Sequence, residues 1–216
     1  MAGTYEQFCA VATALDVVGD RWTLLVVREL LGGPRRYRAL AHDLPGIATN
    51  LLADRLRRLE AAGLLARLPD HDGRARTYQL TDAGQGLRPV IEALGRFGLP
   101  LLPDDAAGLA FRAQWLELAL SLVLRRGALP DDLPVRFDVD TGDGTRTLVH
   151  LRLGPSGVAV DEDGAPDVVV RGDPAALLAV ARDPARTDEL TTAGRLTVTG
   201  DATSRRRLRR ALTGPT

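Results

Sequence analysis

The fold of this chain is decided by residues 49–81, TNLLADRLRRLEAAGLLARLPDHDGRARTYQLT. Leu52, Leu56 and Leu59 recur at the spacing of one helix face, and Gly63 ends the run. Two short apolar-bearing runs follow, separated by a tip rich in Asp, Gly and Arg, which is typical of a β-hairpin. The stretch therefore predicts an amphipathic helix followed by a hairpin.

Three more helices are expected ahead of this stretch. Apolar residues at helical spacing predict them over residues 8–18, 21–31 and 37–43. Asp20 is the expected N-cap of the second helix, because a carboxylate accepts hydrogen bonds from the unpaired backbone amides of a first helical turn. Thr81 is likewise the expected cap of one continuous helix that follows the hairpin.

Helix, helix, helix-turn-helix and hairpin, in that order, form a winged helix. An α-helix fits the major groove of DNA, and a hairpin beside it can lay arginines along a phosphate strand or into the minor groove. Periodicity alone favours an ordinary packed amphipathic helix over residues 49–62. The order of the neighbouring elements favours the DNA-binding interpretation.

Three blocks of sequence carry a family resemblance because they occur together and in order. They are DVVGDRWTLLVVRELLGGPRRYRAL (residues 16–40), LPGIATNLLADRLRRLEAAGLLAR (44–67) and TYQLTDAG (77–84). Residues 5–95 thereby resemble the HxlR branch of the MarR-like winged-helix regulators. The resemblance implies a homodimer in which the helix over residues 49–62 enters the major groove and the hairpin is the wing. Ala48 stands where the family usually has a hydroxyl residue, so Thr49 is expected to take over the capping.

The candidate DNA contacts lie on this helix, ahead of it and on the hairpin. Asn is suited to adenine, and Arg to guanine or to the phosphate backbone. A solvated turn is the alternative at the hairpin, and plain solvation is the alternative at the two arginines ahead of the helix. The candidates are Arg35, Arg36, Thr49, Asn50, Ala53, Arg57, Arg74 and Arg76.

Composition indicates a globular protein without adding support for DNA binding. The 216 residues are 45% hydrophobic and 26% charged, and their formal net charge is zero. Residues 1–103 contain 13 Arg and 11 acidic residues, so DNA affinity must come from the placement of individual arginines. No basic leader precedes an apolar stretch and no stretch is long enough to span a bilayer. We therefore expect a cytoplasmic protein without a membrane span.

The second half of the chain alternates strand and helix patterns. Residues 106–126 predict a helix that is buried or lies at an interface, since WLELALSLVL is apolar nearly all round. Val135, Phe137 and Val139 alternate with polar residues as a strand. Strands are also expected at 149–153, GVAV, PDVVV and LTVTG, with helices capped by Asp173 and Asp201.

This order of elements, with PDVVVRGDPAALLAVA and LTVTGD, resembles the sterol-carrier-protein-like domain over residues 106–212. The resemblance implies a tunnel between sheet and helices that takes an apolar ligand, although no ligand-binding residue can be assigned. RRRLRR, residues 205–210, fits a solvated helix face, with an auxiliary DNA contact as the alternative. DVDTGDG departs from a calcium loop and fits a hairpin turn.

Cys9 is the single cysteine, which excludes an internal disulfide and a multi-cysteine zinc site. Members of the HxlR family commonly have a cysteine near the amino terminus, and in some it senses oxidants or electrophiles. A buried small apolar residue is the alternative, because Cys9 lies in an apolar helical pattern with nothing evident nearby to lower its pKa.

The sequence contains no recognisable catalytic constellation. Its three histidines fall in unrelated contexts, and there is no nucleophile elbow, phosphate-binding glycine loop or metal-spaced cluster. We therefore expect neither an enzyme nor a bound cofactor or metal.

Taken together, these patterns predict an α+β chain. Residues 1–103 are expected to form a winged helix-turn-helix domain, and residues 104–216 a sterol-carrier-like domain with a mainly antiparallel sheet. The predicted function is that of a homodimeric regulator of transcription that binds double-stranded DNA and is modulated by an apolar small molecule or lipid. The alternative is a lipid carrier whose winged helix serves only dimerisation or protein contacts.

Overall fold

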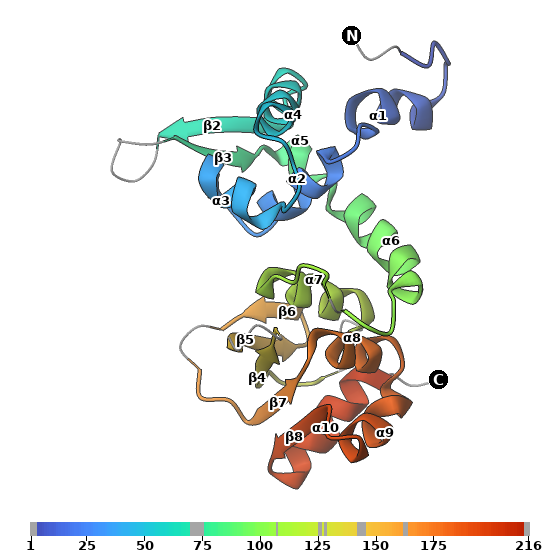
Figure 1. Ribbon diagram of the computed structural model, residues 1–216, viewed down its shortest axis with the longest axis vertical. Helices are drawn as coiled ribbons and strands as arrows, with labels where there is room; N and C mark the ends of the chain where they lie inside the picture. Colours follow the sequence, from blue (N-terminus) through green and yellow to red (C-terminus); the bar gives the residue numbers. More distant parts are fainter. Residues whose placement is uncertain are drawn as a thin grey trace. The chain divides into compact units, whose positions relative to one another are not determined.

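The computed structural model describes residues 4–69, 76–106, 108–124, 127, 129–141, 146–161 and 164–213. The chain forms two compact units, Met1–Ala93 and Leu94–Thr216 (Figure 1). The boundary expected between residues 103 and 104 stays a prediction. None of the described helices is long and apolar enough to cross a bilayer.

The first unit is a winged helix, as the sequence predicts (Figure 1). Its small sheet has the order β1-β3-β2, and both pairings are antiparallel. The elements are α1 (Ala10–Val18), α2 (Thr23–Leu30), β1 (Arg35–Arg36), α3 (Tyr37–Asp43), α4 (Thr49–Ala61), β2 (Leu65–Pro69), β3 (Arg76–Leu80), α5 (Asp82–Gln85) and α6 (Arg88–Gly98), which runs past Ala93.

The core of the first unit holds α4 in place. Leu52, Leu56 and Leu59 are buried on the inner face of α4, which packs against α2 and β2. Full burial of each leucine contributes about 1.5–3 kcal/mol relative to exposure. Gly63 ends the helix with a φ of +71°, and the Leu64 amide donates to the Leu59 carbonyl at 3.0 Å. The predicted periodicity and stop signal are confirmed.

Two of the predicted caps are wrong. The N-cap of α2 is Trp22, at φ +78°, and the Asp20 carboxylate binds Arg55 and Arg58 of α4. The N-cap of α4 is Ala48, and Thr49 is the first helical residue without a capping hydrogen bond. Asp20 lies two residues before the N-cap of α2, and Thr49 lies one residue after the N-cap of α4. Neither side chain is therefore at the capping position.

The helix predicted after the hairpin is divided into two. Thr81 caps α5 as expected, because its Oγ1 accepts from the Gly84 amide at 3.2 Å. A Cβ at Gly84 would lie 2.0 Å from the Leu64 carbonyl oxygen, so only glycine lets α5 approach this closely. The Leu87 amide then donates to the Gly84 carbonyl at 3.1 Å. This bond between residues three apart closes a tight turn that separates α5 from α6.

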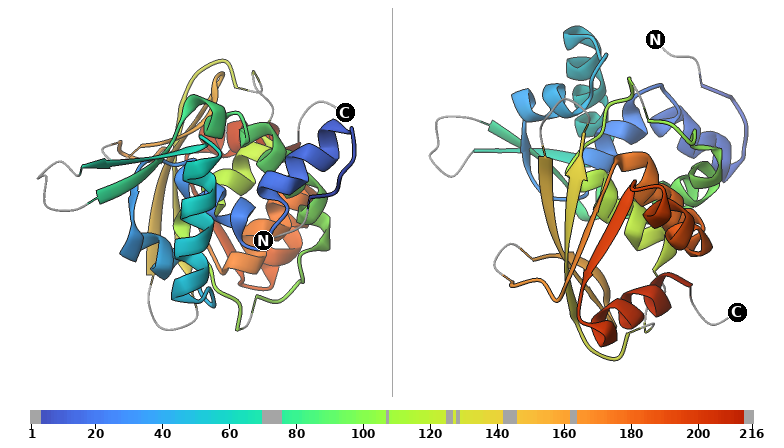
Figure 2. Two further views of the ribbon diagram at one scale, coloured as in Figure 1. Left: turned by 90° about the horizontal axis from the view of Figure 1, so that it is seen from above. Right: turned by 60° about the horizontal axis from the view of Figure 1, so that its bottom comes forward.

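The second unit is a five-stranded sheet with helices packed on one face (Figure 2). Its strand order is β6-β5-β4-β7-β8, and every pairing is antiparallel except the parallel pair β4–β7, which confirms a mainly antiparallel sheet. The elements are η1 (Leu99–Leu101), α7 (Ala113–Val123), β4 (Leu133–Asp140), β5 (Arg146–Gly154), β6 (Gly157–Val160), β7 (Val168–Gly172), α8 (Pro174–Arg182), η2 (Pro184–Arg186), α9 (Thr187–Thr192), β8 (Leu196–Gly200) and α10 (Ala202–Thr213).

Local signals in the second unit are mostly confirmed. Asp173 Oδ1 accepts from the Ala176 amide at 2.7 Å, and Asp201 Oδ1 accepts from the Thr203 amide at 2.7 Å. The inward residues of β4 and β5 alternate as expected and form the core with α7, α8 and α10.

One expectation for this unit is wrong, and one helix was not expected. The helix predicted over 106–126 begins only at Ala113, since Gly108 takes a left-handed φ of +74°, which an α-helix does not contain. The short helix α9 was not predicted. The first residues of DVDTGDG belong to β4, and residues 142–145 lie outside the described part of the chain.

Candidate functional site

The outward face of α4 carries four of the predicted contact residues. Thr49, Asn50 and Arg57 are exposed and Ala53 is half-buried. Their spacing places them on one side of the helix, next to the side that carries the buried leucines. The structure therefore leaves this face of α4 open within its unit, as a groove-binding helix requires.

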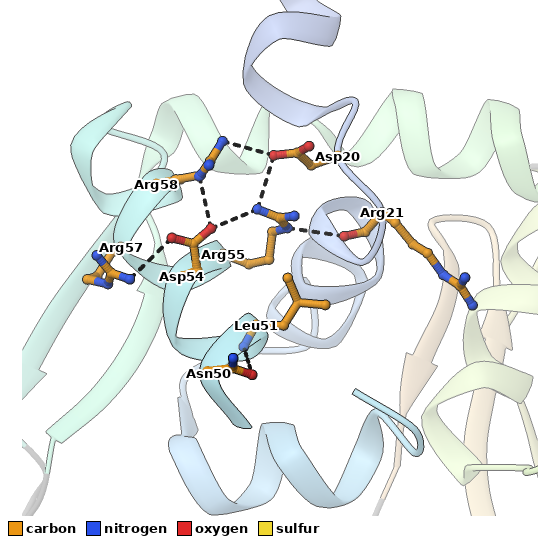
Figure 3. Close-up of polar contacts among 8 residues, drawn as sticks. All are labelled: Asp20, Arg21, Asn50, Leu51, Asp54, Arg55, Arg57 and Arg58. Carbon is orange, nitrogen blue, oxygen red and sulfur yellow. Dashed lines mark hydrogen bonds and ion pairs between the residues drawn. The ribbon is translucent and has the colours of Figure 1, made fainter. Parts of the chain in front are cut away.

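A network of ion pairs surrounds Asp54 on this helix (Figure 3). Asp54 Oδ2 lies 2.9 Å from Arg55 Nη1 and 2.9 Å from Arg58 Nε, and Asp54 Oδ1 lies 3.2 Å from Arg57 Nη2. The Arg57 side chain is 68% exposed, and among the described residues Asp54 is the one partner of its guanidinium group. Because exposed ion pairs contribute only about 0–1 kcal/mol, Arg57 can exchange Asp54 for a phosphate or a base at little cost.

Asp20 extends the network from the turn before α2 (Figure 3). Its Oδ2 lies 3.0 Å from Nη1 of Arg55 and 3.0 Å from Nη1 of Arg58. Arg55 Nε also donates to the Arg21 carbonyl at 3.1 Å, and Arg55 is buried, with 9% of its surface exposed. The network contains three guanidinium groups and two carboxylates, so its net charge is +1. This positive charge favours binding to the phosphate backbone of DNA.

Sequence reasoning did not place Arg55 or Asp20 in this ion-pair network. The i+3 and i+4 spacing from Asp54 to Arg57 and Arg58 is visible in the sequence. Nothing in the local pattern indicates that Asp20 reaches α4, because the two segments meet only through the packing of α2 on α4.

Asn50 is engaged in a local hydrogen bond (Figure 3). Its Oδ1 accepts from the Leu51 amide at 2.9 Å, next to the start of α4. Bidentate recognition of adenine needs both the oxygen and the nitrogen of the amide group. The side chain must therefore release Leu51 before it can pair with adenine in this way.

The turn ahead of α4 fixes where the helix begins. Tyr37 Oη donates to the Thr49 carbonyl at 2.7 Å, which ties the start of α3 to the start of α4. The Ile47 amide donates to the Leu44 carbonyl at 3.2 Å, and Gly46 takes a φ of +89° in the same turn. Sequence reasoning identified this turn but not the Tyr37 contact.

The small sheet brings other candidate arginines together. Arg35 and Arg36 form β1, and Arg36 is also the N-cap of α3, which begins at Tyr37. Arg36 pairs with Thr77 of β3, so it lies one position along the register from Arg76. Arg36 and Arg76 are exposed, whereas Arg35 is half-buried, with its Nη1 4.0 Å from Asp43 Oδ2. Arg74 lies outside the described residues.

Cys9 is exposed, and it precedes α1 as the N-cap residue. The amides of Ala12 and Val11 at the start of the helix lower the pKa of the Cys9 thiol. The expectation that nothing nearby lowers this pKa is therefore wrong, because α1 begins only at Ala10 and the amides of its first turn face Cys9. Whether Cys9 senses oxidants stays a prediction.

The second unit contains a cavity of about 260 Å³ between its sheet and its helices. Apolar side chains of β4, β7, β8, α8 and α10 form most of its wall, among them Phe137, Val170 and Leu177. Part of the RRRLRR run also faces it, while Arg207 Nη2 donates to the carbonyls of Asp131 and Asp132 at 3.0 and 3.2 Å. The cavity lies where the sequence resemblance implies an apolar site.

The class of winged helix-turn-helix proteins is defined by three helices, an outward-facing helix after a tight turn and a two-stranded wing. Residues 17–105 match the HxlR-like helix-turn-helix family model, and residues 132–213 match that of the SCP-2 sterol transfer family. The chain belongs to the HxlR-like helix-turn-helix family.

Two regulators and one solved structure are similar to the first part of this chain. The HTH-type transcriptional regulator sll1512 of Synechocystis sp. is 35% identical over 102 residues, which cover 46% of this chain and 75% of the relative. The HTH-type transcriptional regulator Rv3095 of Mycobacterium tuberculosis is 43% identical over 95 residues. That match covers 44% of this chain and 60% of the relative. The solved structure of the redox regulator HypR in its reduced form is 28% identical, with a TM-score of 0.40, and the match covers 42% of this chain and 90% of HypR.

Proposed function

We propose that this protein is a homodimeric, cytoplasmic regulator of transcription that binds specific sites in double-stranded DNA. The observation that carries the proposal is the open face of α4, where exposed Arg57, paired with Asp54, lies beside exposed Thr49 and Asn50. A helix with such a face can enter the major groove and present polar side chains to base edges.

The contacts divide into base recognition and phosphate binding. Asn50 and Arg57 are suited to hydrogen bonds with base edges. Thr49 and Ala53 complete the helix surface that would face the bases. Arg36 and Arg76, which lie close together on β1 and β3, are suited to a phosphate strand. Arg38 of α3 is exposed and adds a candidate phosphate contact that sequence reasoning did not include.

A dimer accounts for apolar side chains that a monomer leaves in water. Phe8, Val11 and Leu15 are exposed at and beside α1, and Leu94 and Phe97 are exposed on α6. Coverage of such side chains by a second copy is favourable at about 25 cal/mol per Å² of apolar surface. The two recognition helices would then lie about 34–36 Å apart on a near-palindromic operator.

The second unit is proposed to modulate DNA binding through an apolar ligand in its cavity. The ligand would change the spacing of the two DNA-binding units, which requires that it bind the two dimer states with different affinity. The cavity of about 260 Å³ with a mainly apolar wall supports this part of the proposal.

The experiment that tests the proposal is selection of DNA from a random oligonucleotide pool, followed by titration of the selected site at several salt concentrations. A DNA-binding regulator selects one near-palindromic site, and its affinity falls steeply with salt, by a logarithmic slope of about −0.9 for each phosphate contact. A lipid carrier that uses the winged helix only for protein contacts selects no site and does not bind DNA even at low salt.

A further inference from the structure

A carboxylate lies on the face of α4 that is proposed to enter the major groove. Asp54 follows Asn50 by four residues and precedes Arg57 by three, and this spacing places all three on one side of the helix. The Asp54 side chain is 31% exposed. A negative charge at this place repels DNA phosphates, so a helix that bound only the phosphate backbone would bind more tightly without it.

The two oxygens of Asp54 contact different arginines (Figure 3). Oδ2 accepts from Nη1 of Arg55 at 2.9 Å and lies 2.9 Å from Nε of Arg58. These two contacts engage both lone-pair sites of this oxygen. Oδ1 accepts from Nη2 of Arg57 at 3.2 Å. Asp54 is therefore fixed to its own helix through one oxygen and holds Arg57 with the other.

Arg57 and Arg58 are held in different ways. Arg58 contacts Asp54 through Nε, and its Nη1 donates to Asp20 Oδ2 at 3.0 Å, so two carboxylates fix its guanidinium group. Arg57 contacts Asp54 through Nη2, and no second partner occurs in the part of the chain that the structure describes. A guanidinium group has five N–H donors, so Arg57 can bind another acceptor without leaving Asp54.

A guanidinium group that is already paired with a carboxylate distinguishes between the two kinds of acceptor that DNA offers. Guanine presents N7 and O6 in the major groove, which are uncharged and match two N–H donors of an arginine. A phosphate is an anion, and at Arg57 it would lie close to the Asp54 carboxylate. Repulsion between the two anions lowers the affinity of Arg57 for phosphate but does not affect its hydrogen bonds to guanine.

The contact with Asp54 also restricts the Arg57 side chain before DNA binds. An exposed arginine samples many rotamers, and fixing one of them on binding costs conformational entropy. A side chain that is already oriented loses less of this freedom. The network as a whole keeps its positive charge, so α4 is still attracted to DNA, and Asp54 determines which group Arg57 contacts there.

We propose that Asp54 is a positioning residue for sequence specificity, which directs Arg57 to N7 and O6 of a guanine and away from the phosphate backbone. The inference rests on the proposed function and adds to it a residue that acts through another side chain. It predicts a guanine in each half-site whose recognition depends on both Asp54 and Arg57.

The test is fluorescence anisotropy of the full chain with three kinds of duplex. They are the selected site, the same site with 7-deazaguanine at each guanine in turn, and random-sequence DNA. The modified base lacks the N7 acceptor, so one substitution in each half-site should weaken binding of the unchanged protein about tenfold. Asp54→Asn should reduce this loss to about threefold or less. It should also raise the affinity for random-sequence DNA about threefold, because a charge that repels phosphate is removed.

Two further variants separate position from charge. Glu60→Gln is the matched control, because Glu60 is an exposed carboxylate of the same helix that lies 3.5 Å from Arg67. It removes the same charge and should keep the full loss at 7-deazaguanine. Asp54→Glu keeps the charge but displaces the carboxylate, so it should reduce that loss without raising the affinity for random-sequence DNA. Thermal unfolding shows whether each variant is folded, and Asp54→Glu decides the test if Asp54→Asn is not.

Three outcomes would overturn the inference. They are a site in which no guanine is sensitive to the substitution, a loss in the Asp54 variants as large as in the unchanged protein, and an equal reduction of the loss in Glu60→Gln. If any of these occurs while the unchanged protein binds its selected site, the regulator stands and the role of Asp54 is wrong. If no site is selected and no DNA binds, the proposed function fails and the inference fails with it.

Discussion

The Asp20 carboxylate lies 3.0 Å from Nη1 of Arg55 and thereby joins the turn before α2 to the middle of α4. Arg55 is the buried member of the network, and it also binds Asp54 and the Arg21 carbonyl. A buried guanidinium group needs such partners because an unpaired buried charge is costly. The orientation of the proposed recognition helix therefore depends on a residue that precedes α2.

Asp20→Asn should destabilise the first unit by about 1–2 kcal/mol, because Arg55 and Arg58 each lose an ion-pair partner. Denaturant unfolding followed by circular dichroism measures the change. Asp82→Asn is the control, since Asp82 is exposed and should change stability by less than about 0.5 kcal/mol. Equal stability of the Asp20 variant and the unchanged protein would show that the network does not hold α4.

Arg76→Ala should weaken binding to all DNA sequences similarly and reduce the slope of affinity against salt by about 0.9, as expected for one lost phosphate contact. Arg146→Ala provides a comparison, because Arg146 is an exposed arginine of β5 in the second unit. A slope that is unchanged in the Arg76 variant, measured by fluorescence anisotropy, would mean that the base of the wing does not contact phosphate.

Asn50→Ala should relax the preference for one base pair of the selected site, at a cost of about 1–3 kcal/mol for that pair. Affinity for unrelated DNA should stay the same, because the contact carries sequence information only. Repeating the oligonucleotide selection with the variant measures both effects. If the selected site is unchanged, Asn50 serves only the local hydrogen bond to Leu51.

Acid should destabilise the second unit partly through Asp173. Burial opposes ionisation of this residue, but the hydrogen bonds from Arg195 and from the Ala176 amide outweigh it and lower the pKa. A carboxyl whose folded-state pKa is lowered stabilises the fold above its unfolded pKa and loses that contribution as pH falls through the folded value. Asp173→Asn keeps a capping oxygen but loses the ion pair with Arg195, so it should cost about 0.5–1 kcal/mol at pH 7 and progressively less below about pH 4. Denaturant unfolding at several pH values tests this, with exposed Asp167→Asn as the comparison; a cost that is independent of pH would contradict it.

Cys9 should react with iodoacetamide at lower pH than free cysteine does, because the amides of Ala12 and Val11 stabilise its thiolate. The pH dependence of the labelling rate, followed by mass spectrometry, gives the midpoint. A midpoint at or above that of free cysteine would contradict the expectation. If DNA binding responds to oxidants in Cys9→Ser as in the unchanged protein, Cys9 is not the sensor.

Elements that depend on nearby residues could be predicted from the sequence. The periodicity of α4, the hairpin and the caps at Thr81, Asp173 and Asp201 all involve residues within a few positions of one another. The same holds for the outward side of α4, which follows from the helical spacing of its buried leucines.

Features that depend on residues distant in the sequence could not be predicted. Asp20 has the composition of a cap, yet packing of α2 against α4 directs it to Arg55 and Arg58. The two residues of β1 have no strand pattern of their own and are a strand only because β3 pairs with them. Which side chains of α10 reach the cavity likewise depends on how α10 packs against the sheet and η2.

The most direct test of the central claim is dimethyl sulfate protection of the selected DNA site, because this reagent methylates guanine N7 in the major groove and adenine N3 in the minor groove. With Thr49–Ala61 in the major groove, two groups of guanine N7 atoms should be protected, about 10–10.5 base pairs apart. The Arg57→Ala variant should lose protection within each group. Binding that leaves every guanine N7 reactive and protects only adenine N3 would contradict the account.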